Sequence, residues 1–278
     1  MTMINTRWVS TDGARSSPAG HAGSDQEGDP EVSSPLHLPS AGPEPIPAGA
    51  AVAAVLGYAA ARRPLYYRAP NARTGRWAEV PAFGYERFDR RPVPDAPLGE
   101  ADILTAEGLH GRLGRDEWTA MAAALPAVQS LAEDVVARAE GRAFWELPED
   151  EFSVLAEPGT VGALLRSIAE LCGSAGVSRW HVAAALHHRH PELFPLLHTA
   201  TRWALLPHGR EGDSGLEAVV HRELLHSADA FAELEAAVRA EGVGLTRLRL
   251  HDVLLWLSAT LRFAHAVAAG SASGARVG

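Results

Sequence analysis

The chain of 278 residues contains no lysine, and all 25 of its basic residues are arginine. Schiff-base catalysis by a side-chain amine is therefore impossible, which excludes lyase chemistry and pyridoxal enzymes that depend on a lysine. The phosphate-binding lysine of a Walker motif is excluded for the same reason.

Cysteine occurs once, at Cys172. The chain therefore forms no internal disulfide and holds no iron–sulfur cluster with four cysteine ligands. Cys172 lies on the apolar face of a predicted helix, and free cysteine is among the residues most often buried. We therefore expect it in the core.

Several motifs of cofactor and metal enzymes are also missing: the sequence has no glycine-rich dinucleotide loop, no Gly-x-Ser-x-Gly elbow and no His-Glu-x-x-His helix. Glu107-x-x-His110 and Glu223-x-x-His226 have the spacing that di-iron bundles use. With 13 histidines in the chain, matches of this kind are expected by chance. We predict neither a metal nor a cofactor.

Long apolar runs are absent as well. The first 20 residues lack the apolar core of a secretion signal, and no later stretch gives 18 uncharged, apolar residues. We therefore predict a cytoplasmic protein without a membrane partner. Nothing in the sequence distinguishes a monomer from an oligomer.

The net charge of −9 disfavours a general nucleic-acid binder, which normally carries a basic stripe. The charge is unevenly distributed, however. Residues 1–48 hold six acidic residues and two arginines, so they contribute −4 of the total. Residues 160–210 hold five arginines, two acidic residues and six histidines, which makes this central stretch mildly basic.

Composition divides the chain into three parts. Residues 1–47 are rich in Ser, Gly, Pro and Asp without apolar periodicity, and we predict a disordered tail. Residues 48–98 contain a helix beginning near Pro47, followed by an irregular arm rich in proline, arginine and aromatic residues. We expect aromatic packing in this arm and a short hairpin at 71–75; the alternative is that the arm stacks bases or walls a ligand.

Residues 99–270 show helical periodicity without a competing strand pattern, so we predict an all-α, globular multi-helix domain. Pro126 is expected to separate two helices, and Thr246 to cap the last one. The predicted helices span 99–110, 116–125, 126–140, several segments within 160–206, 215–227, 229–241 and 246–269.

Two helices joined by a short turn form the centre of this domain. The turn at 173–178 contains two glycines, and Ser178 is a candidate cap for the second helix. Unpaired amides at a helix start attract anions. Gly176, Ser178, Arg179 and Arg189 are therefore candidate anion-binding residues, and the alternative is a plain helix–helix connection.

This region resembles the helix-hairpin-helix region of an uncharacterised actinobacterial family, which is itself similar to the helix-hairpin-helix DNA glycosylase superfamily. The matching segments are Gly176-Val177, the run at 183–186, Arg189, the run at 190–193, Pro195-Leu196, and 248–256 for the closing helix. The resemblance implies a helix-hairpin-helix-like element that binds DNA. The catalytic aspartate of the superfamily is replaced by His198, and the usual second glycine of the hairpin is missing, so we predict no glycosylase activity.

Asp252 stands within an apolar helix, where a carboxylate is costly to bury unless it is paired. Arg202 or Arg247 is the expected partner. A pocket formed by Arg202, His198, Asp252 and Tyr85 would bind a phosphate or sulfate group and stabilise it as a leaving group.

Two function hypotheses follow from these residues. The first is a non-catalytic, helix-hairpin-helix-type protein that binds anions or nucleic acid through Arg179 and Arg189. The second is a small-molecule enzyme of actinobacterial specialised metabolism, such as antibiotic biosynthesis, that uses Arg202, His198 and Asp252 on an anionic substrate. A purely structural partner protein is a third possibility.

Overall fold

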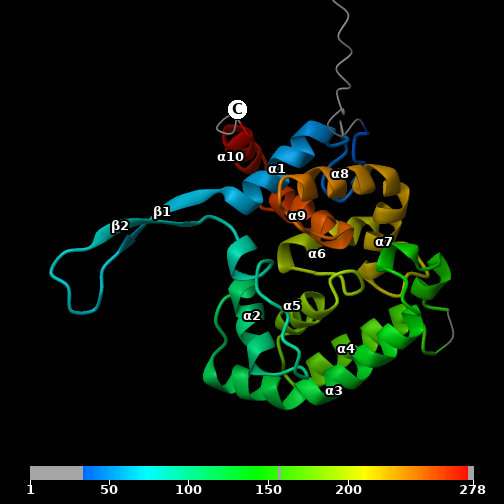
Figure 1. Cartoon of the computed structure of the whole chain (residues 1–278). Coiled ribbons are helices and arrows are strands. Elements are labelled where there is room, and N and C mark those ends of the chain that lie inside the picture. Colours follow the sequence, from blue (N-terminus) through cyan, green and yellow to red (C-terminus); the bar gives the residue numbers. More distant parts are fainter. Residues whose placement is uncertain (1–33, 156–157, 275–278) are drawn as a thin grey trace, which may run out of the picture.

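The computed structural model describes residues 34–155 and 158–274 (Figure 1). The helices in these ranges are α1 (Ala48–Ala60), α2 (Glu100–His110), α3 (Arg115–Ala139), α4 (Val161–Ser174), α5 (Arg179–Arg189), α6 (Thr199–Leu205), α7 (Leu216–His226), α8 (Ala228–Ala240), α9 (Arg247–Ala259) and α10 (Phe263–Gly274). Short 3-10 turns are η1 (Tyr85–Arg87), η2 (Phe144–Glu146), η3 (Glu149–Phe152) and η4 (Leu206–His208). The strands are β1 (Arg62–Tyr67) and β2 (Arg76–Pro81). The predicted all-α, multi-helix fold is confirmed.

The helices pack around one continuous apolar core. Helix α1 packs against α8 and α10, α2 against α5, α3 against α4, and α6 against α9. In Figure 1, α1, α8, α9 and α10 lie on one side of the body, α2 to α5 lie on the other, and β1 and β2 project away from it.

Helix α3 runs through Pro126, so the expected break at this proline is wrong. The buried residues Met121, Leu125 and Val128 continue the same apolar face on both sides of it. Pro126 itself is exposed, which places the lost backbone hydrogen bond on the solvent side of the helix.

By length and composition alone, α3 passes as a membrane-spanning helix, and so does the bent pair α9 and α10. In α3 the charged residues Glu133, Asp134 and Arg138 are exposed, while its apolar face contacts α4. The core helix of a folded domain meets the same criterion.

The predicted single helix at 246–269 is two helices. Thr246 caps α9 as expected, because its hydroxyl accepts a hydrogen bond from the amide of Arg249 at 3.3 Å. Leu261 has a φ of 58°, and the amide of Arg262 donates to the carbonyl of Leu257, which closes α9. The chain bends by 117° at this point, so that α10 can pack against α1.

The boundary predicted for the disordered tail is wrong for residues 34–47; residues 1–33 lie outside the described residues. Leu36 and Leu38 are buried in the main core, and Leu36 pairs with Ile46 through backbone hydrogen bonds of 2.9 Å. The amide and hydroxyl of Ser40 both donate to the buried carboxylate of Glu223. The sequence did not indicate this packed segment, because its proline and glycine residues interrupt apolar periodicity but do not prevent the leucines from being buried.

The segment expected to be an irregular arm forms an antiparallel ribbon in which Tyr67 pairs with Arg76. The expectation that its aromatics pack is correct for Phe83 and Phe88, which are buried. Tyr66 and Trp77 pack only against each other, with ring centres 5.3 Å apart, and both are exposed, as Tyr67 is. The strands extend from the body on their own, so no core is within reach of these rings (Figure 1).

Candidate anion-binding cavity

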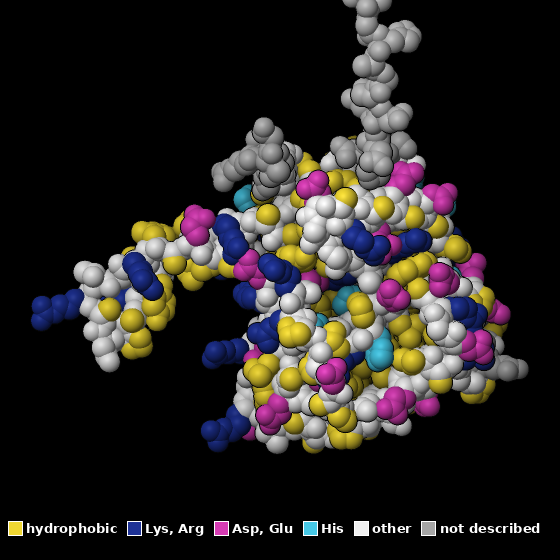
Figure 2. Space-filling view, in the orientation of Figure 1, with side chains coloured by type: hydrophobic (Ala, Val, Ile, Leu, Met, Phe, Trp, Pro, Cys, Tyr) yellow, Lys and Arg dark blue, Asp and Glu magenta, His cyan; other side chains and the backbone are white. Residues whose placement is uncertain are grey.

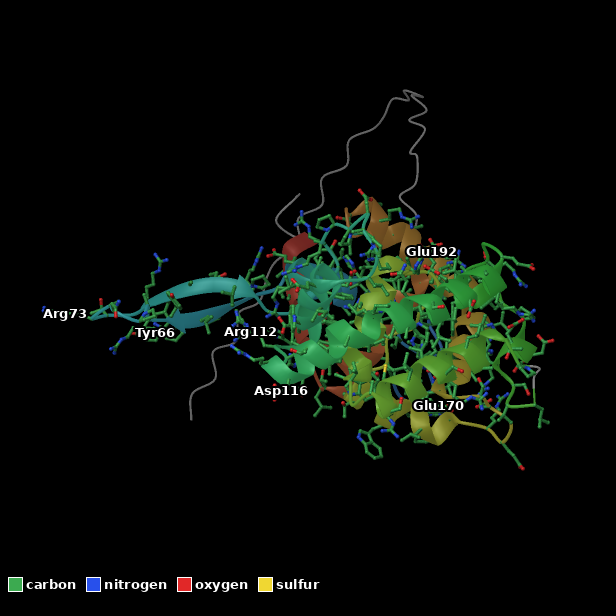
Figure 3. All side chains as sticks on the ribbon, turned by 90° about the horizontal axis from the view of Figure 1, so that it is seen from below. Tyr66, Arg73, Arg112, Asp116, Glu170 and Glu192 are labelled. Carbon is green, nitrogen blue, oxygen red and sulfur yellow. The ribbon has the colours of Figure 1, made fainter. Side chains whose placement is uncertain are left out.

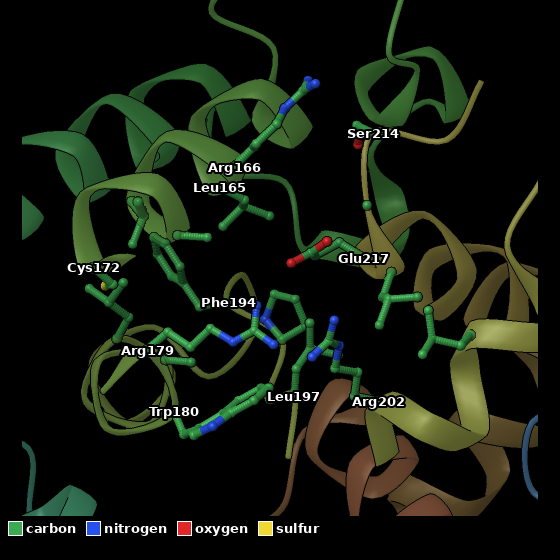
Figure 4. A pocket seen from close by; sticks show the side chains of 18 residues that line it. Leu165, Arg166, Cys172, Arg179, Trp180, Phe194, Leu197, Arg202, Ser214 and Glu217 are labelled. Carbon is green, nitrogen blue, oxygen red and sulfur yellow. The ribbon is translucent and has the colours of Figure 1, made fainter. Parts of the chain in front are cut away.

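A cavity of about 280 Å³ lies between α4, α5, α6 and the first turn of α7 (Figure 4). Its polar side chains come from all four helices: Arg166 from α4, Arg179 from α5, Arg202 from α6 and Glu217 from α7. The apolar wall includes Leu165, Ile168, Cys172, Phe194, Pro195, Leu197 and Leu216. Charged groups thus meet an apolar surface in a space suited to a small molecule.

Arg179 and Arg202 extend their guanidinium groups toward the middle of this cavity, whereas Arg166 turns away from them (Figure 4). Among residues 34–155 and 158–274, the side chains of these three arginines form no ion pair and no hydrogen bond. The Arg179 guanidinium stacks 4.0 Å from the centre of the Trp180 ring, which fixes its direction. Burial and then the nearby charge of Arg202 lower the pKa of Arg179.

Glu217 is the acidic group of the cavity, and its carboxylate points toward Arg179 (Figure 4). The side chain folds back over the start of α7, so closely that a Cβ atom at Gly215 would meet Glu217 Oε2 at 2.3 Å. Burial raises the pKa of Glu217, and the positive charges of Arg179 and Arg166 only partly oppose this. Burial thus favours the neutral form of this carboxyl group more than water would.

Cys172 closes part of the apolar wall. It is buried as expected, and burial raises the pKa of its thiol. It is therefore a protonated, apolar neighbour of the cavity at neutral pH.

The glycine turn is not built as the sequence suggested. The amides of Gly176 and Val177 donate to the carbonyls of Gly173 and Cys172, at 3.3 and 2.9 Å, and so close α4. Ser178 occupies the cap position of α5, but its hydroxyl lies 2.8 Å from His181 Nδ1 and does not cap an amide. These two turn amides are therefore not available to an external anion.

Arg189 was predicted to bind an anion together with Arg179, and this is wrong. Its Nε and Nη2 atoms donate to the two oxygens of buried Asp102, at 2.6 and 2.8 Å. Nη1 also donates to the carbonyls of Pro94 and Ala96. Nη2 donates as well to the carbonyl of Pro97 at 3.4 Å, so all five donors of this guanidinium are used and it connects α5 to α2.

The predicted catalytic residues divide between two cavities. His198 and Asp252 meet, with 3.3 Å between His198 Nε2 and Asp252 Oδ2, and both line a second cavity of about 200 Å³. Arg202 lines the first cavity, and Tyr85 lies against the ring of Tyr58 without lining either one.

Asp252 is paired, as a buried carboxylate requires, but the expected partners Arg202 and Arg247 are wrong. Its partner is Arg249, one helical turn earlier on α9. Arg249 also binds Asp89, with 2.6 Å between Nε and Oδ1, and donates to the hydroxyl of Tyr58 at 2.7 Å. The spacing of three residues between Arg249 and Asp252 was the available sequence signal, whereas the distant Asp89 and Tyr58 gave none.

The second cavity also contains an unsatisfied oxygen. Although burial acts to raise the pKa of Asp252, His198 and Arg249 outweigh it and lower the pKa to about 2. Its Oδ1 atom is buried and has no hydrogen-bond partner among the described residues. His110 lies against His198, with ring centres 4.8 Å apart, and burial followed by neighbouring histidine charges lowers its pKa to about 3.

The glutamates of the two Glu-x-x-His motifs form hydrogen bonds within the protein. Glu107 accepts a hydrogen bond from the amide of Leu113, and Glu223 binds Ser40 and His251. Within the described ranges, no group of three or more histidine, cysteine or acidic side chains has an arrangement that would hold a metal ion.

Comparison of the chain with models of known protein families, with curated proteins and with solved structures finds no match.

Proposed function

We propose that this protein binds a small molecule that carries an anionic group and an apolar part, in the cavity between α4, α5, α6 and α7. The observation that carries this proposal is the pair of guanidinium groups, Arg179 and Arg202, that face one cavity without a hydrogen-bonded acid. In most other places the buried or half-buried arginines of this fold are paired, as Arg189, Arg222 and Arg249 are.

Two positive groups that share a partly enclosed space repel each other, and an anion between them removes that repulsion. Arginine binds carboxylate, sulfate and phosphate groups through paired, charge-assisted hydrogen bonds. The apolar wall around Leu165 and Phe194 would contact the remainder of the ligand. The volume of about 280 Å³ favours a ligand with one ring or a short chain over a large cofactor.

Calorimetric titration with phenyl phosphate and with inorganic phosphate tests the proposal. Phenyl phosphate should bind more tightly, because only its ring uses the apolar wall. Removing one charged hydrogen-bond donor costs about 1.5–3 kcal/mol, so Arg179→Met and Arg202→Met should each weaken binding roughly tenfold or more. Arg239→Met, which removes an exposed arginine paired with Glu235, is the control. Equal affinity in the wild type and in both cavity variants would exclude this site.

A second candidate function is proton transfer at the His198–Asp252 pair, favoured by the unsatisfied Asp252 Oδ1 atom beside a cavity. A carboxylate that holds one ring nitrogen of a histidine orients the other nitrogen as a base. The test is hydrolysis of p-nitrophenyl phosphate and p-nitrophenyl sulfate. General-base catalysis contributes about 100-fold or more, so His198→Asn should lower turnover by that factor. Turnover that His198→Asn leaves unchanged would remove this candidate.

A further inference from the structure

The ribbon of β1, β2 and their connecting loop, residues 62–81, is here named the arm. It extends far from the body, and Tyr66 and Arg73 mark its length in Figure 3. Its root is fixed, because the amide of Ala82 donates to the carbonyl of Ala61 at 2.9 Å and Arg62 pairs with Glu86. The arm is therefore a directed projection from the helical body.

The arm carries a charge opposite to that of the chain. It contains five arginines (Arg62, Arg63, Arg68, Arg73 and Arg76) and one acidic residue, Glu79, so its charge is +5 − 1 = +4, while the whole chain has −9. Within the described ranges, only Arg62 of these arginines forms an ion pair. Figure 2 shows their dark blue side chains along the arm. Such a distribution selects a polyanionic partner.

Aromatic side chains stand among these arginines. Tyr66, Tyr67 and Trp77 are 53%, 50% and 70% exposed. Tyr66 and Trp77 are cross-strand partners with ring centres 5.3 Å apart, and the Tyr66 hydroxyl accepts a hydrogen bond from the amide of Gly75. These contacts hold the rings in place at the surface, although nothing in the described chain covers them.

Both faces of the arm have this character. The pairing register places Tyr66 and Trp77 on one face and Tyr67 and Arg76 on the other. Arg68 and Arg73 belong to the loop at the tip. A partner that contacts only one flat side would leave half of these groups in water, whereas a groove encloses them all.

We propose that the arm inserts into the major groove of duplex DNA. That groove is about 12 Å wide and admits a two-stranded ribbon. Arginines on the two faces and at the tip of the arm would contact phosphates on both walls, and the rings would contact base edges and methyl groups. The proposed nucleic-acid site is therefore the arm, and not the glycine turn with Arg189, which Asp102 holds at the end of α5.

Fluorescence anisotropy with a labelled 30-base-pair duplex of random sequence tests this. Three phosphate contacts contribute about 2–3 to the slope of log affinity against log salt. The triple variant Arg68→Ala, Arg73→Ala, Arg76→Ala should therefore lower that slope by about this amount and weaken binding more than tenfold at 50 mM salt. Trp77→Ala should weaken binding by about the same factor at low and high salt, because it removes no charge.

The matched control is Arg115→Ala, Arg210→Ala, Arg239→Ala, which removes the same charge from exposed positions on the body. It should leave the slope unchanged. An equal loss in both triple variants would overturn the proposal, because binding would then follow overall charge. Tighter binding to single-stranded DNA than to the duplex would contradict insertion into the major groove. Self-association that is lost in the arm variant, without DNA binding, would assign the arm to a second copy of this chain.

Discussion

Arg249 holds together parts of the chain that lie far apart in sequence. It is buried on α9, and its guanidinium binds Asp89 after η1, Tyr58 on α1 and Asp252 on its own helix. Burial would lower its pKa, but the two carboxylates and the Tyr58 hydroxyl outweigh this and raise it. The core of this fold therefore depends on a permanent positive charge.

Replacing Arg249 by methionine should destabilise the fold strongly. Asp89 and Asp252 would be left as buried carboxylates without their counter-charge, and breaking a buried pair in this way costs about 3–5 kcal/mol. Urea denaturation at pH 7 measures the loss. Arg239→Met removes only an exposed pair with Glu235 and should change the free energy of unfolding by less than about 1 kcal/mol. Similar losses in the two variants would contradict this account.

Because of the same cluster, we expect the free energy of unfolding to decrease at acidic pH. The pKa of Asp252 in the folded state is about 2, below its ordinary value near 3.8. A lowered carboxyl pKa stabilises the fold above the unfolded value, and this contribution is lost as the pH falls from about 4 toward 2. Asp252→Asn should flatten that part of the stability curve, measured by urea denaturation between pH 5 and pH 2. If the free energy of unfolding of Asp252→Asn varied with pH as in the wild type, other groups would be responsible for acid unfolding.

Glu217 makes a different prediction for ligand binding. Its pKa is raised by burial, so it becomes neutral at a higher pH than an ordinary glutamate does. Because its carboxylate competes with a ligand anion for Arg179, affinity for phenyl phosphate should rise as the pH falls through that pKa. Glu217→Gln should bind more tightly at neutral pH and lose most of this dependence. Calorimetry across the pH range checks both effects, and a variant with unchanged pH dependence would exclude Glu217 as the cause.

For single residues, the sequence predicted that a side chain requires a partner more reliably than it predicted which residue that partner is. It indicated that Asp252 must be paired and that Arg179 is a candidate for anion binding. It gave no sign that Arg189 meets Asp102, which is 87 residues away. Pairings over such distances depend on how helices pack, and side-chain type alone carries no such information.

Among the elements, the crossing of α1 and α10 depends on two glycines. A Cβ atom at Gly57 would lie 1.8 Å from the carbonyl oxygen of Ala266, and one at Gly270 would lie 1.9 Å from that of Ala53. These backbones touch, so no side chain fits between them. The close approach explains why α10 folds back after α9 and does not continue it.

Gly57→Ala should therefore force the two helices apart and lower the free energy of unfolding by about 1–3 kcal/mol, the usual cost of overpacking. Gly49→Ala is the matched control on the same helix, because a Cβ atom there meets nothing within 4 Å. It should be neutral or stabilise by up to about 1 kcal/mol through helix propensity. Thermal unfolding of the two variants makes the comparison, and equal effects would contradict the contact.

Element boundaries followed the local signals wherever those signals dominated. The helices predicted at 99–110, 215–227 and 229–241 lie within one residue of α2, α7 and α8 at each end. The two failures, at Pro126 and Leu261, are cases in which tertiary packing overrides local preference. A continuous buried face keeps α3 whole, and the contact with α1 bends the chain after α9.

For the molecule as a whole, residues 34–47 act as an outer layer over α7 and α8. A chain that lacks residues 1–33 is the reference for thermal stability, because it keeps every contact described for residues 34–47. Removing residues 1–47 should lower it by well over 5 °C, since burying a leucine contributes about 1.5–3 kcal/mol and both Leu36 and Leu38 are lost. Leu36→Ala in the full chain gives an independent measurement. Equal melting temperatures of the two truncated chains would support the original prediction that the disordered tail extends to residue 47.

Charge is the property for which sequence averages were most misleading. The mildly basic stretch at 160–210 coincided with the predicted anion-binding or nucleic-acid-binding site. In the fold, Arg189 is held by Asp102, and Arg179 and Arg202 face a cavity. The arm instead projects its arginines away from the body (Figure 2). A local sum of charges records neither the direction of a side chain nor its partner.

Cys172 in the wall of the cavity has a practical consequence. It is the chain's only cysteine, and the chain has no lysine to compete for electrophiles. Because its thiol is buried and protonated, an alkylating reagent reacts slowly with it, at one position next to the place where we expect the ligand. Slower alkylation in the presence of phenyl phosphate would measure occupancy directly, without a label on the ligand, and would allow collections of unlabelled metabolites to be screened by mass spectrometry.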